Sequence, residues 1–339
     1  MAWYQVKGNE ADTVISSRIR LARNINGYPF GKRLSAENAE KILSEVEKAL
    51  GGDYTRTDMT ALSPVGARAL MEQHLISPEF ASGKTPRALF RNDKKSMYVM
   101  ALEEDHLRLQ CILPGLALED AYRFATECDE KLSEALDIAF DKRLGYLTHC
   151  PTNLGTGLRA SVMLFLPAMT ENRMIPSLSH QLQKIGLTIR GIYGEGSAAH
   201  GCIYQISNQV TLGLSAEDIL KKLGETVGSI IEKERGLRRA VTGEAAILFE
   251  DRCQRALGTL CYAKCISSEE FFSLYRDVKL GIAKGLLSHI SHETLNTLLI
   301  SVMPAMLYES GAVAGSSALE RDIARAEFIK KALEVKPHG

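Results

Sequence analysis

The sequence predicts an α+β protein in which a mostly antiparallel sheet, flanked by helices, is followed by an all-helical C-terminal domain. Strand-like runs between residues 13 and 213 mostly follow one another along the chain, and that order favours antiparallel pairing. From residue 215 onward every segment has helical periodicity, with Gly or Pro breaks and no strand pattern. We therefore expect two domains, at residues 1–225 and 226–339.

Each element of the first domain has its own local signal. The segment SAENAEKILSEVEKAL predicts a helix because Ser35 can act as its N-cap and the apolar residues after it have helical spacing. Short apolar runs between polar breaks predict a meander of strands from Pro86 to Leu113. The expected strands lie at residues 13–24, 87–92, 96–105, 106–115, 160–167, 187–194 and 202–213, and the expected helices at 35–50, 118–140 and 173–185.

Composition excludes several classes of function. With 339 residues, of which 45% are hydrophobic and 24% charged, the chain can bury a sizeable core. Lys+Arg and Asp+Glu both number 41, so no net charge favours a nucleic-acid or membrane partner. The chain shows neither a signal-peptide pattern nor a transmembrane run, and we expect a cytoplasmic protein. Seven cysteines without a repeated metal spacing predict mostly free, buried thiols and no metal site.

One stretch, THCPTNLGTGLRASVMLFLP, places Cys150 and two glycines close to Arg159. Three interpretations compete: a dinucleotide loop, a cysteine nucleophile, and a site that binds phosphate through arginine. GTGLRA fits the GxGxxG/A pattern, but the polar THCPTN before it cannot be the buried strand that a dinucleotide loop requires. SGKT lacks the earlier glycine of a Walker A loop, and no protease signature surrounds Cys150.

Arginines recur beside carboxylates or glycines elsewhere in the chain, which favours the phosphate site. Arg18 and Arg20 have a spacing of two, so on a strand they point to the same face. EEDHLR places Glu103, Glu104 and Asp105 just before Arg108, and RGIYGEG places Arg190 before Glu195. Each group alone is typical of a solvated salt-bridge cluster. Together they indicate phosphate chemistry.

At these residues the sequence resembles the guanidino kinases, also called phosphagen kinases. SSRIRLARN, EEDHLR, CPTNLGTGLRASV and RGIYGEG through ISN resemble the catalytic blocks of that family, in order, over most of residues 12–213. Three features are most similar to the bacterial protein-arginine kinases of McsB type: the first block begins at Ser16, RGIYGEG contains a tyrosine, and RDIARA resembles a phosphoarginine-binding motif. The sequence departs from the family at Leu102, where asparagine is usual, and in GSAAHG, which lacks an acidic residue often found after Glu195.

The resemblance implies roles for individual residues. Glu104 and Glu195 would hold the substrate guanidinium and accept its proton, and Cys150 would align it as a thiolate. ATP with Mg²⁺ would be bound at Ser16, Ser17, Arg18, Ile19, Arg20, His74, Arg108, Arg159, Ala160, Ser161, Val162, Met163, Arg190, Gly191, Ile192, Tyr193, Gly194 and Glu195. A separate, regulatory phosphoarginine site would use Arg321, Asp322, Arg325 and Ala326. On a helix Arg321 and Arg325 would share one face.

The resemblance implies a guanidino-kinase catalytic domain at 1–225 and an ATP-dependent protein-arginine kinase. Its partners would be arginine-bearing proteins, a Clp-type protease and a heat-shock repressor. An activator protein and a homodimer stay open. Two alternatives also stay open: a kinase for a small free guanidine such as arginine, and a non-catalytic adaptor that binds phosphoarginine.

Overall fold

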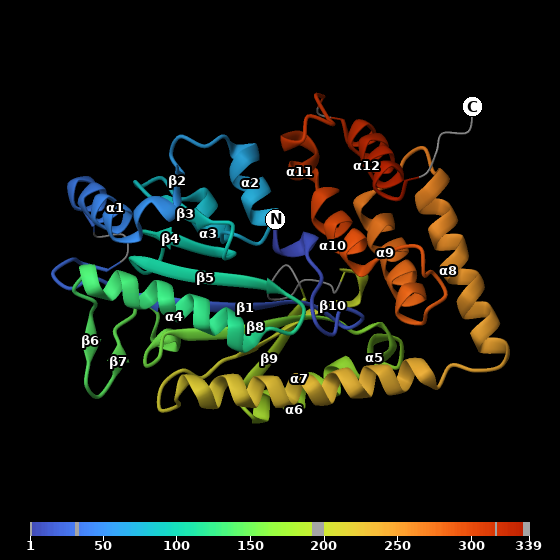
Figure 1. The fold of residues 1–339 in the computed structure, drawn as a ribbon, viewed down its shortest axis with the longest axis horizontal. Coiled ribbons are helices and arrows are strands. Elements are labelled where there is room, and N and C mark those ends of the chain that lie inside the picture. The colour runs from blue at the N-terminus through green and yellow to red at the C-terminus, as the bar shows by residue number, and fades with distance from the viewer. Residues whose placement is uncertain (1, 31–33, 192–199, 316, 335–339) are drawn as a thin grey trace.

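The structure is a computed structural model that describes residues 2–30, 34–191, 200–315 and 317–334 (Figure 1). Its strands are β1 (Val14–Arg23), β2 (Thr55–Asp58), β3 (Ala88–Asn92), β4 (Met97–Ala101), β5 (Leu107–Pro114), β6 (Phe140–Asp141), β7 (Gly145–Tyr146), β8 (Leu158–Phe165), β9 (Leu187–Gly191) and β10 (Ile203–Asn208). Its helices are α1 (Ala36–Leu50), α2 (Pro64–Glu72), α3 (Pro78–Ser82), α4 (Leu118–Ala135), α5 (Pro167–Glu171), α6 (Ile175–Lys184), α7 (Ala216–Arg239), α8 (Glu244–Tyr262), α9 (Ser268–Ala283), α10 (His292–Ser301), α11 (Pro304–Glu309) and α12 (Ala318–Ala332). Short 3₁₀ turns include η1 (Trp3–Gln5) and η4 (Pro151–Asn153).

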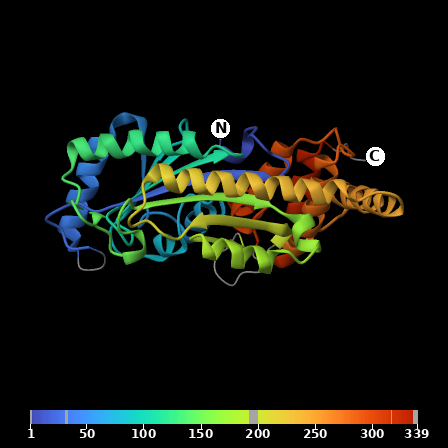
Figure 2. The same cartoon turned by 90° about the horizontal axis from the view of Figure 1, so that it is seen from below.

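Eight strands form one sheet in the order β2-β3-β4-β5-β1-β8-β10-β9, and β6 and β7 form a separate hairpin. Every pairing between neighbouring strands of the large sheet is antiparallel, as the sequence predicts. Strand β1 lies between β5 and β8, far from either edge. Helix α4 packs on β1 and β5, and α7 packs on β8 and β10 (Figures 1 and 2).

The two faces of β1 have different functions. Ser17 donates from Oγ to the carbonyl of Gly115 at 2.8 Å and accepts from the amide of Ala117 at 3.0 Å, directly before α4. Because side chains alternate along a strand, Arg18 and Arg20 point to the face away from α4. The helices therefore cover one face of the central strands and leave the arginine side for a site.

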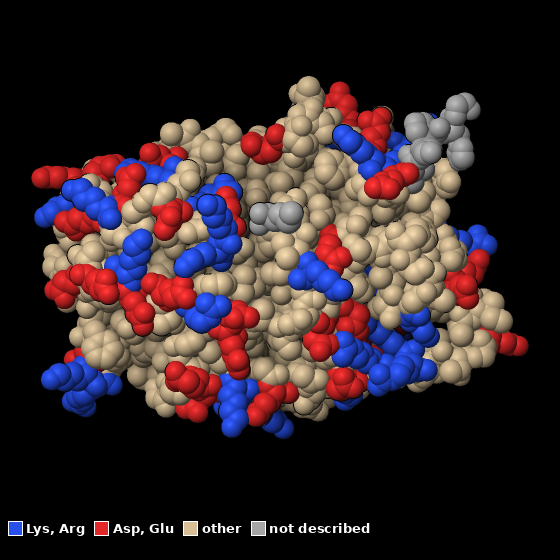
Figure 3. All heavy atoms as spheres, viewed as in Figure 1, with Lys and Arg blue, Asp and Glu red and all other residues tan. Residues whose placement is uncertain are grey.

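Helices α8 to α12 gather at one end of the molecule, beside the N-terminal turn η1 (Figure 1). One cluster of buried apolar side chains runs through the sheet and these helices, from Ile19 and Val162 to Leu223, Leu260 and Leu298. Acidic and basic side chains are mixed over the face that Figure 3 shows. No helix in the described ranges is long and apolar enough to cross a membrane.

The helix predicted at 118–140 is too long, because α4 ends at Ala135 and Phe140 belongs to β6. Residues after α4 pair instead with the segment after β1: the amide of Asn26 donates to Asp137 at 2.8 Å, and that of Ala139 to Asn24 at 2.8 Å. Tertiary pairing thus replaces the last helical turn. The strand predicted at 160–167 begins earlier, at Leu158, and gives way to α5.

Four short elements were not predicted from the sequence: β2, α2, α3 and α5, which are only four to nine residues long. Helix α7 runs without a break through residue 225, where the sequence analysis places the domain boundary. The boundary stays a prediction.

Candidate active site

Four of the predicted arginines come from three adjacent strands in the middle of the sheet. Arg18 and Arg20 lie on β1, Arg159 on β8 and Arg108 on β5. In the strand register Arg20 is paired with Arg159 on one side and with Gln110 on the other. Residues paired across two antiparallel strands point to the same face of the sheet, so these guanidinium groups converge.

The arginines strongly influence one another. Burial, together with the charges of Arg159 and Arg108, lowers the pKa of Arg18 to about 10. The pKa of Arg20 is also lowered, first by burial and then by Arg18. The Arg20 Nε is buried and has no hydrogen-bond partner. Like charges repel one another, so this group of arginines is more stable with a bound polyanion, which can also accept from the Arg20 Nε.

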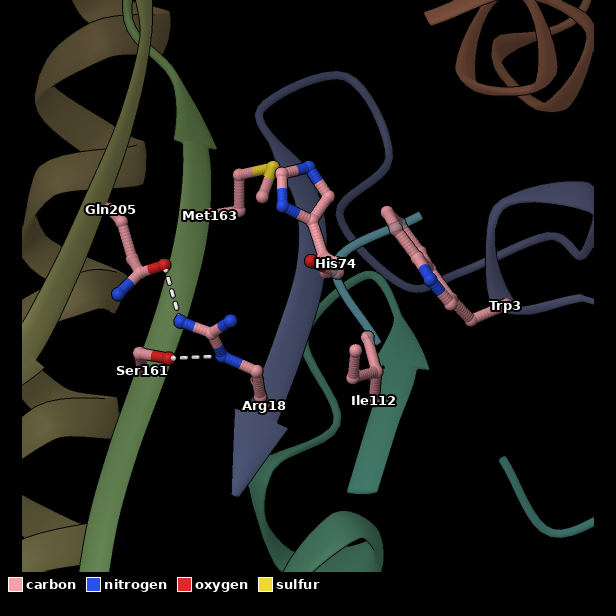
Figure 4. Close-up of a pocket in the computed structure, with 8 residues that line it drawn as sticks. Trp3, Arg18, His74, Ile112, Ser161, Met163 and Gln205 are labelled. Atoms are coloured by element: carbon pink, nitrogen blue, oxygen red, sulfur yellow. Dashed lines mark hydrogen bonds between the residues drawn. The ribbon is translucent and has the colours of Figure 1, made fainter. Parts of the chain in front are cut away.

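A small pocket opens beside Arg18 (Figure 4). Arg18 donates to Gln205 Oε1 at 2.7 Å and to Ser161 Oγ at 3.4 Å, so its guanidinium is held in place by β8 and β10. The lining residues are Trp3, Ser16, Arg18, His74, Ile112, Ser161, Met163 and Gln205. The structure therefore brings five predicted ATP-site residues together: Ser16, Arg18, His74, Ser161 and Met163.

His74 joins this pocket through an unusual backbone conformation. Its φ is +61°, in the left-handed region, directly after α2. Its ring centroid lies 6.2 Å from that of Trp3, whose Nε1 donates to the carbonyl of Gln73 at 3.2 Å. Burial, with a smaller contribution from Arg18, lowers the pKa of His74 to about 4. His74 is thus a neutral imidazole near pH 7, suited to an uncharged part of a ligand.

The carboxylates of EEDHLR lie on the turn between β4 and β5. The amide of Leu102 donates to the carbonyl of His106 at 2.7 Å and closes the turn. Leu102 has a φ of +70°, a conformation in which asparagine costs less than leucine. The departure from the family at this position therefore carries backbone strain but keeps the turn.

Glu103 and Glu104 have different environments. Glu103 has a side chain only 5% exposed; it accepts from the Ser77 hydroxyl and lies 2.7 Å from Arg108 Nη1. Glu104 is 38% exposed, with Oε2 3.5 Å from Arg108 Nη2. Burial and the neighbouring Asp105 charge raise the pKa of Glu104. Glu103 is thus the salt-bridged carboxylate that the sequence analysis considered, whereas Glu104 keeps an accessible oxygen with increased proton affinity.

Asp105 differs from the salt-bridge interpretation. It is buried, and its Oδ1 accepts from Asn24 Nδ2 at 2.7 Å and from the amide of His149 at 2.6 Å. The donors are a side-chain amide and a backbone amide, so Asp105 forms no salt bridge through these bonds. Asp105 therefore connects the carboxylate turn to the segment that carries Cys150.

Cys150 is half-buried at the start of η4, and its Sγ lies 3.0 Å from Thr152 Oγ1. Two glycines allow the chain to pass from this turn into β8. Gly157 has a φ of +63°, and a Cβ there would lie 2.6 Å from Arg23 Nη1 and 2.7 Å from the Ala22 carbonyl. The close contacts at Gly157 thus leave no room for a side chain where the chain enters β8. Arg159 itself lies on the strand.

Several predicted ATP-site residues point elsewhere. Ser17 and Ile19 alternate with the arginines of β1, and Ala160 and Val162 alternate with Arg159 on β8; all four are buried. Their side chains lie on the helix-covered face of the sheet, and their assignment to the ATP site stays a prediction. Arg190 lies on β9, paired with Gln205, and Gly191 ends that strand. Ile192, Tyr193, Gly194 and the catalytic candidate Glu195 lie outside the described residues.

The RDIARA residues lie on α12, but not as one open face. Arg325 is 1% exposed, and it donates to the carbonyls of Val302 at 3.0 Å and Ile266 at 2.6 Å and to Asp322 Oδ1 at 2.6 Å. Ala326 is also buried. Arg321 and Asp322 are partly exposed, and Arg321 Nη1 lies 3.4 Å from the Tyr308 hydroxyl. Arg321 and Arg325 are one turn apart on α12, as predicted, but Arg325 is part of the helical core and only Arg321 is partly exposed.

Five residues of the site were not predicted from the sequence: Trp3, Asn24, Ser77, Ile112 and Gln205. Asn24 and Gln205 occur inside quoted motifs, but their partners are distant in the chain, as for Arg18 and Gln205. Trp3 is the only tryptophan of the chain, which is the one signal that could have drawn attention to it. Ser77 has no distinguishing pattern.

Comparison with known proteins gives matches over both parts of the chain. The family model "ATP:guanido phosphotransferase, C-terminal catalytic domain" matches residues 36–237, and "Protein-arginine kinase McsB C-terminal domain" matches residues 246–338. A protein-arginine kinase of Desulforamulus reducens is 42% identical, with 98% of this chain and 95% of the relative covered. That of Bacillus subtilis is 41% identical, with 100% and 94% covered.

Solved structures share the fold. Lombricine kinase matches with a TM-score of 0.60 and 26% identity, over 70% of each chain. The substrate-free duplicated taurocyamine kinase of Schistosoma mansoni matches with a TM-score of 0.60 and 27% identity, over 76% of this chain and 40% of its own.

Proposed function

Because the chain belongs to the ATP:guanido phosphotransferases, and within them to the protein-arginine kinases, we propose that it transfers the γ-phosphoryl group of ATP to arginine side chains of proteins. The observation that supports this most directly is the convergence of Arg18, Arg20, Arg108 and Arg159 beside the turn that carries Glu104. Cations for phosphate and a carboxylate for guanidinium are thus adjacent.

ATP is held mainly by charge. Phosphoryl transfer requires positioning and positive charge around the transferring group, and the strand arginines supply both. His74 and Trp3, at the pocket beside Arg18, contact the base or ribose. The described residues contain no cluster of three or more His, Cys, Asp and Glu side chains that could hold a metal. Mg²⁺ bound together with ATP would add to the positive charge that the strand arginines supply.

Arginine cannot attack while its guanidinium is fully protonated. Its pKa is about 12.5 to 13.8, so a base must take a proton as the nitrogen approaches phosphorus. Glu104 accepts this proton, and its raised pKa makes it a stronger base than an ordinary carboxylate. Glu195, by family resemblance, holds the other side of the guanidinium. Cys150 aligns the guanidinium through its sulfur and forms no covalent intermediate.

Phosphoarginine, the product, also regulates the kinase and marks the phosphorylated proteins for degradation. We assign phosphoarginine binding to the partly exposed Arg321 and Asp322 of α12, in a frame held by Arg325 and Ala326. In the cytoplasm, phosphorylated proteins would be degraded by a Clp-type protease, and a heat-shock repressor would be one substrate. An activator protein and a homodimer are further partners of the proposal.

One experiment separates the candidate functions. The protein is incubated with ATP, Mg²⁺, an unfolded protein and free arginine, and the products are identified by mass spectrometry under non-acidic conditions. We expect phosphate on arginine residues of the protein. Phosphorylation of free arginine alone would indicate a small-guanidine kinase. Binding of phosphoarginine without any transfer would indicate an adaptor.

A further inference from the structure

Two buried polar residues connect the turn that carries Glu104 with the loop that carries Cys150. Asp105, 2% exposed, uses a single oxygen, Oδ1, for two bonds. One comes from Asn24 Nδ2 at 2.7 Å, and the other from the amide of His149, directly before Cys150, at 2.6 Å. The carboxylate next to Glu104 is therefore also bonded to the residue next to the thiol.

Asn24 completes the connection. It is fully buried, at the end of β1. Its Nδ2 also donates to the carbonyl of Leu147 at 3.0 Å, and its Oδ1 accepts from the amide of His106 at 2.8 Å. Both N–H groups and the oxygen of this amide are thus used. Asn24, directly after the strand that carries Arg18 and Arg20, is thus bonded twice to the turn and once to the loop.

We propose that Asp105 and Asn24 are positioning residues that fix the distance between Glu104 and Cys150. This inference rests on the roles proposed above for those two residues. A shift of about 1 Å in a reacting group can cost on the order of 10²-fold in rate. Buried hydrogen bonds to the Asp105 carboxylate hold the turn and the loop together, and bonds of this kind prevent such a shift.

Asp105 has one other potential use. Its Oδ2 is buried without a hydrogen-bond partner, and Asp105 is among the residues that line a cavity with Leu102, Glu103 and Pro86. If that oxygen bound the substrate directly, removal of Asp105 would weaken substrate binding independently of Cys150. A positioning role instead predicts that Asp105 matters only while Glu104 and Cys150 are present to be aligned.

The test is a pair of double-mutant cycles that combine Asp105→Ala with Cys150→Ala and with Glu104→Gln. The kcat and KM for an unfolded protein substrate, and the KM for ATP, are measured for each variant. We expect Asp105→Ala to lower kcat by on the order of 10²-fold with the KM for ATP unchanged. In either impaired background the same change should lower kcat by less than about threefold.

Two further variants separate positioning from stability. Asp105→Asn keeps an oxygen for both bonds but buries an unpaired N–H₂, so we expect a lower melting temperature with kcat within a few-fold of wild type. Asn296→Ala removes another buried asparagine, on α10 and not on the elements that carry Glu104 and Cys150, and should lower stability without affecting kcat. If Asp105→Ala does not fold, Asn24→Ala takes its place in both cycles.

The outcomes are distinct. Multiplying effects in both cycles, with Glu104→Gln and Cys150→Ala themselves impaired, would overturn the positioning role and leave the proposed function intact. A raised KM for the protein substrate that is the same in all backgrounds would make Asp105 a direct binding residue and also overturn the proposal. Wild-type rates in Glu104→Gln and Cys150→Ala would reject both the proposed function of these residues and the inference built on it.

Discussion

Arg20 on β1 and Arg159 on β8 lie directly opposite each other in the sheet, and the Arg20 Nε is buried without a hydrogen-bond partner. Like charges directly opposite on neighbouring strands destabilise a sheet. Burial and the charges of Arg18, Arg159 and Arg108 lower the pKa of Arg20. The empty site is therefore electrostatically unfavourable, and an anion such as the ATP phosphates relieves it.

The opposed arginines should lower the stability of the nucleotide-free protein and strengthen its binding of ATP. Arg20→Met should leave the nucleotide-free protein as stable as wild type, or more stable by up to about 1 kcal/mol, because an apolar side chain replaces a half-buried charge that lies among other arginines. The same variant should lose the rise in melting temperature that ATP produces. Denaturant unfolding and a thermal titration with ATP measure the two effects. Arg123→Met, on the exposed side of α4, is the control. A destabilised variant with normal ATP binding would contradict the argument.

Glu104 provides a second prediction. Glu104→Gln should keep the fold and the affinity for ATP but lose on the order of 10²- to 10⁴-fold in turnover, because glutamine cannot accept the proton. In the wild type, the raised pKa should place the acid limb of kcat/KM above the ordinary carboxylate value of 4.5. Activity then falls as the pH decreases through that limb, because protonated Glu104 is no longer a base. Glu79→Gln, at an exposed position on α3, should change neither quantity. Near-normal turnover in Glu104→Gln would remove this residue from the mechanism.

The sequence predicts the arginine face well and its surroundings poorly, and the reason is the range of the interactions. The spacing of Arg18 and Arg20 determines that both point to one face, because alternation along a strand is local. The pairing of Arg159 with Arg20 depends on which strands are neighbours in the sheet. The order of the elements along the chain limits the possible neighbours but does not determine them. Asn24 and Asp105 are 81 positions apart, and no local pattern predicts their bond.

The burial of Arg325 also depends on contacts with residues that are distant in the sequence. Helical spacing places it one turn from Arg321 and suggests a shared face. The carbonyls that it binds, of Val302 and Ile266, come from other parts of the helical domain. Periodicity describes a helix in isolation, whereas tertiary packing decides which of its faces is covered. The end of α4 at Ala135 is a similar case.

His74 predicts a pH dependence of stability. Burial lowers its pKa to about 4 in the folded protein, against 6.5 for an ordinary histidine. Between these values the unfolded chain binds a proton that the folded chain does not, so stability falls as the pH decreases from about 6.5 towards 4. His74→Gln should reduce this slope in a series of melting temperatures, and His180→Gln, at an exposed position, should not. An unchanged slope in His74→Gln would mean that His74 is not buried as a neutral ring.

The last prediction separates the two arginines of RDIARA. Arg325 is fully buried and satisfies two backbone carbonyls and Asp322, so Arg325→Ala should lower the free energy of unfolding by about 3 to 5 kcal/mol. Arg321 is partly exposed, and Arg321→Ala should change stability by less than about 1 kcal/mol.

A phosphoarginine side chain carries both a phosphate and a guanidinium-like group, which Arg321 and Asp322 complement. We therefore expect Arg321→Ala/Asp322→Ala to fold but to lose both binding of phosphoarginine and the stimulation that it causes, several-fold to a hundredfold if the coupling is about 1 to 3 kcal/mol. Calorimetric titration and initial rates with added phosphoarginine measure the two. Equal binding and stimulation in the double variant would mean that α12 contributes only to the helical core.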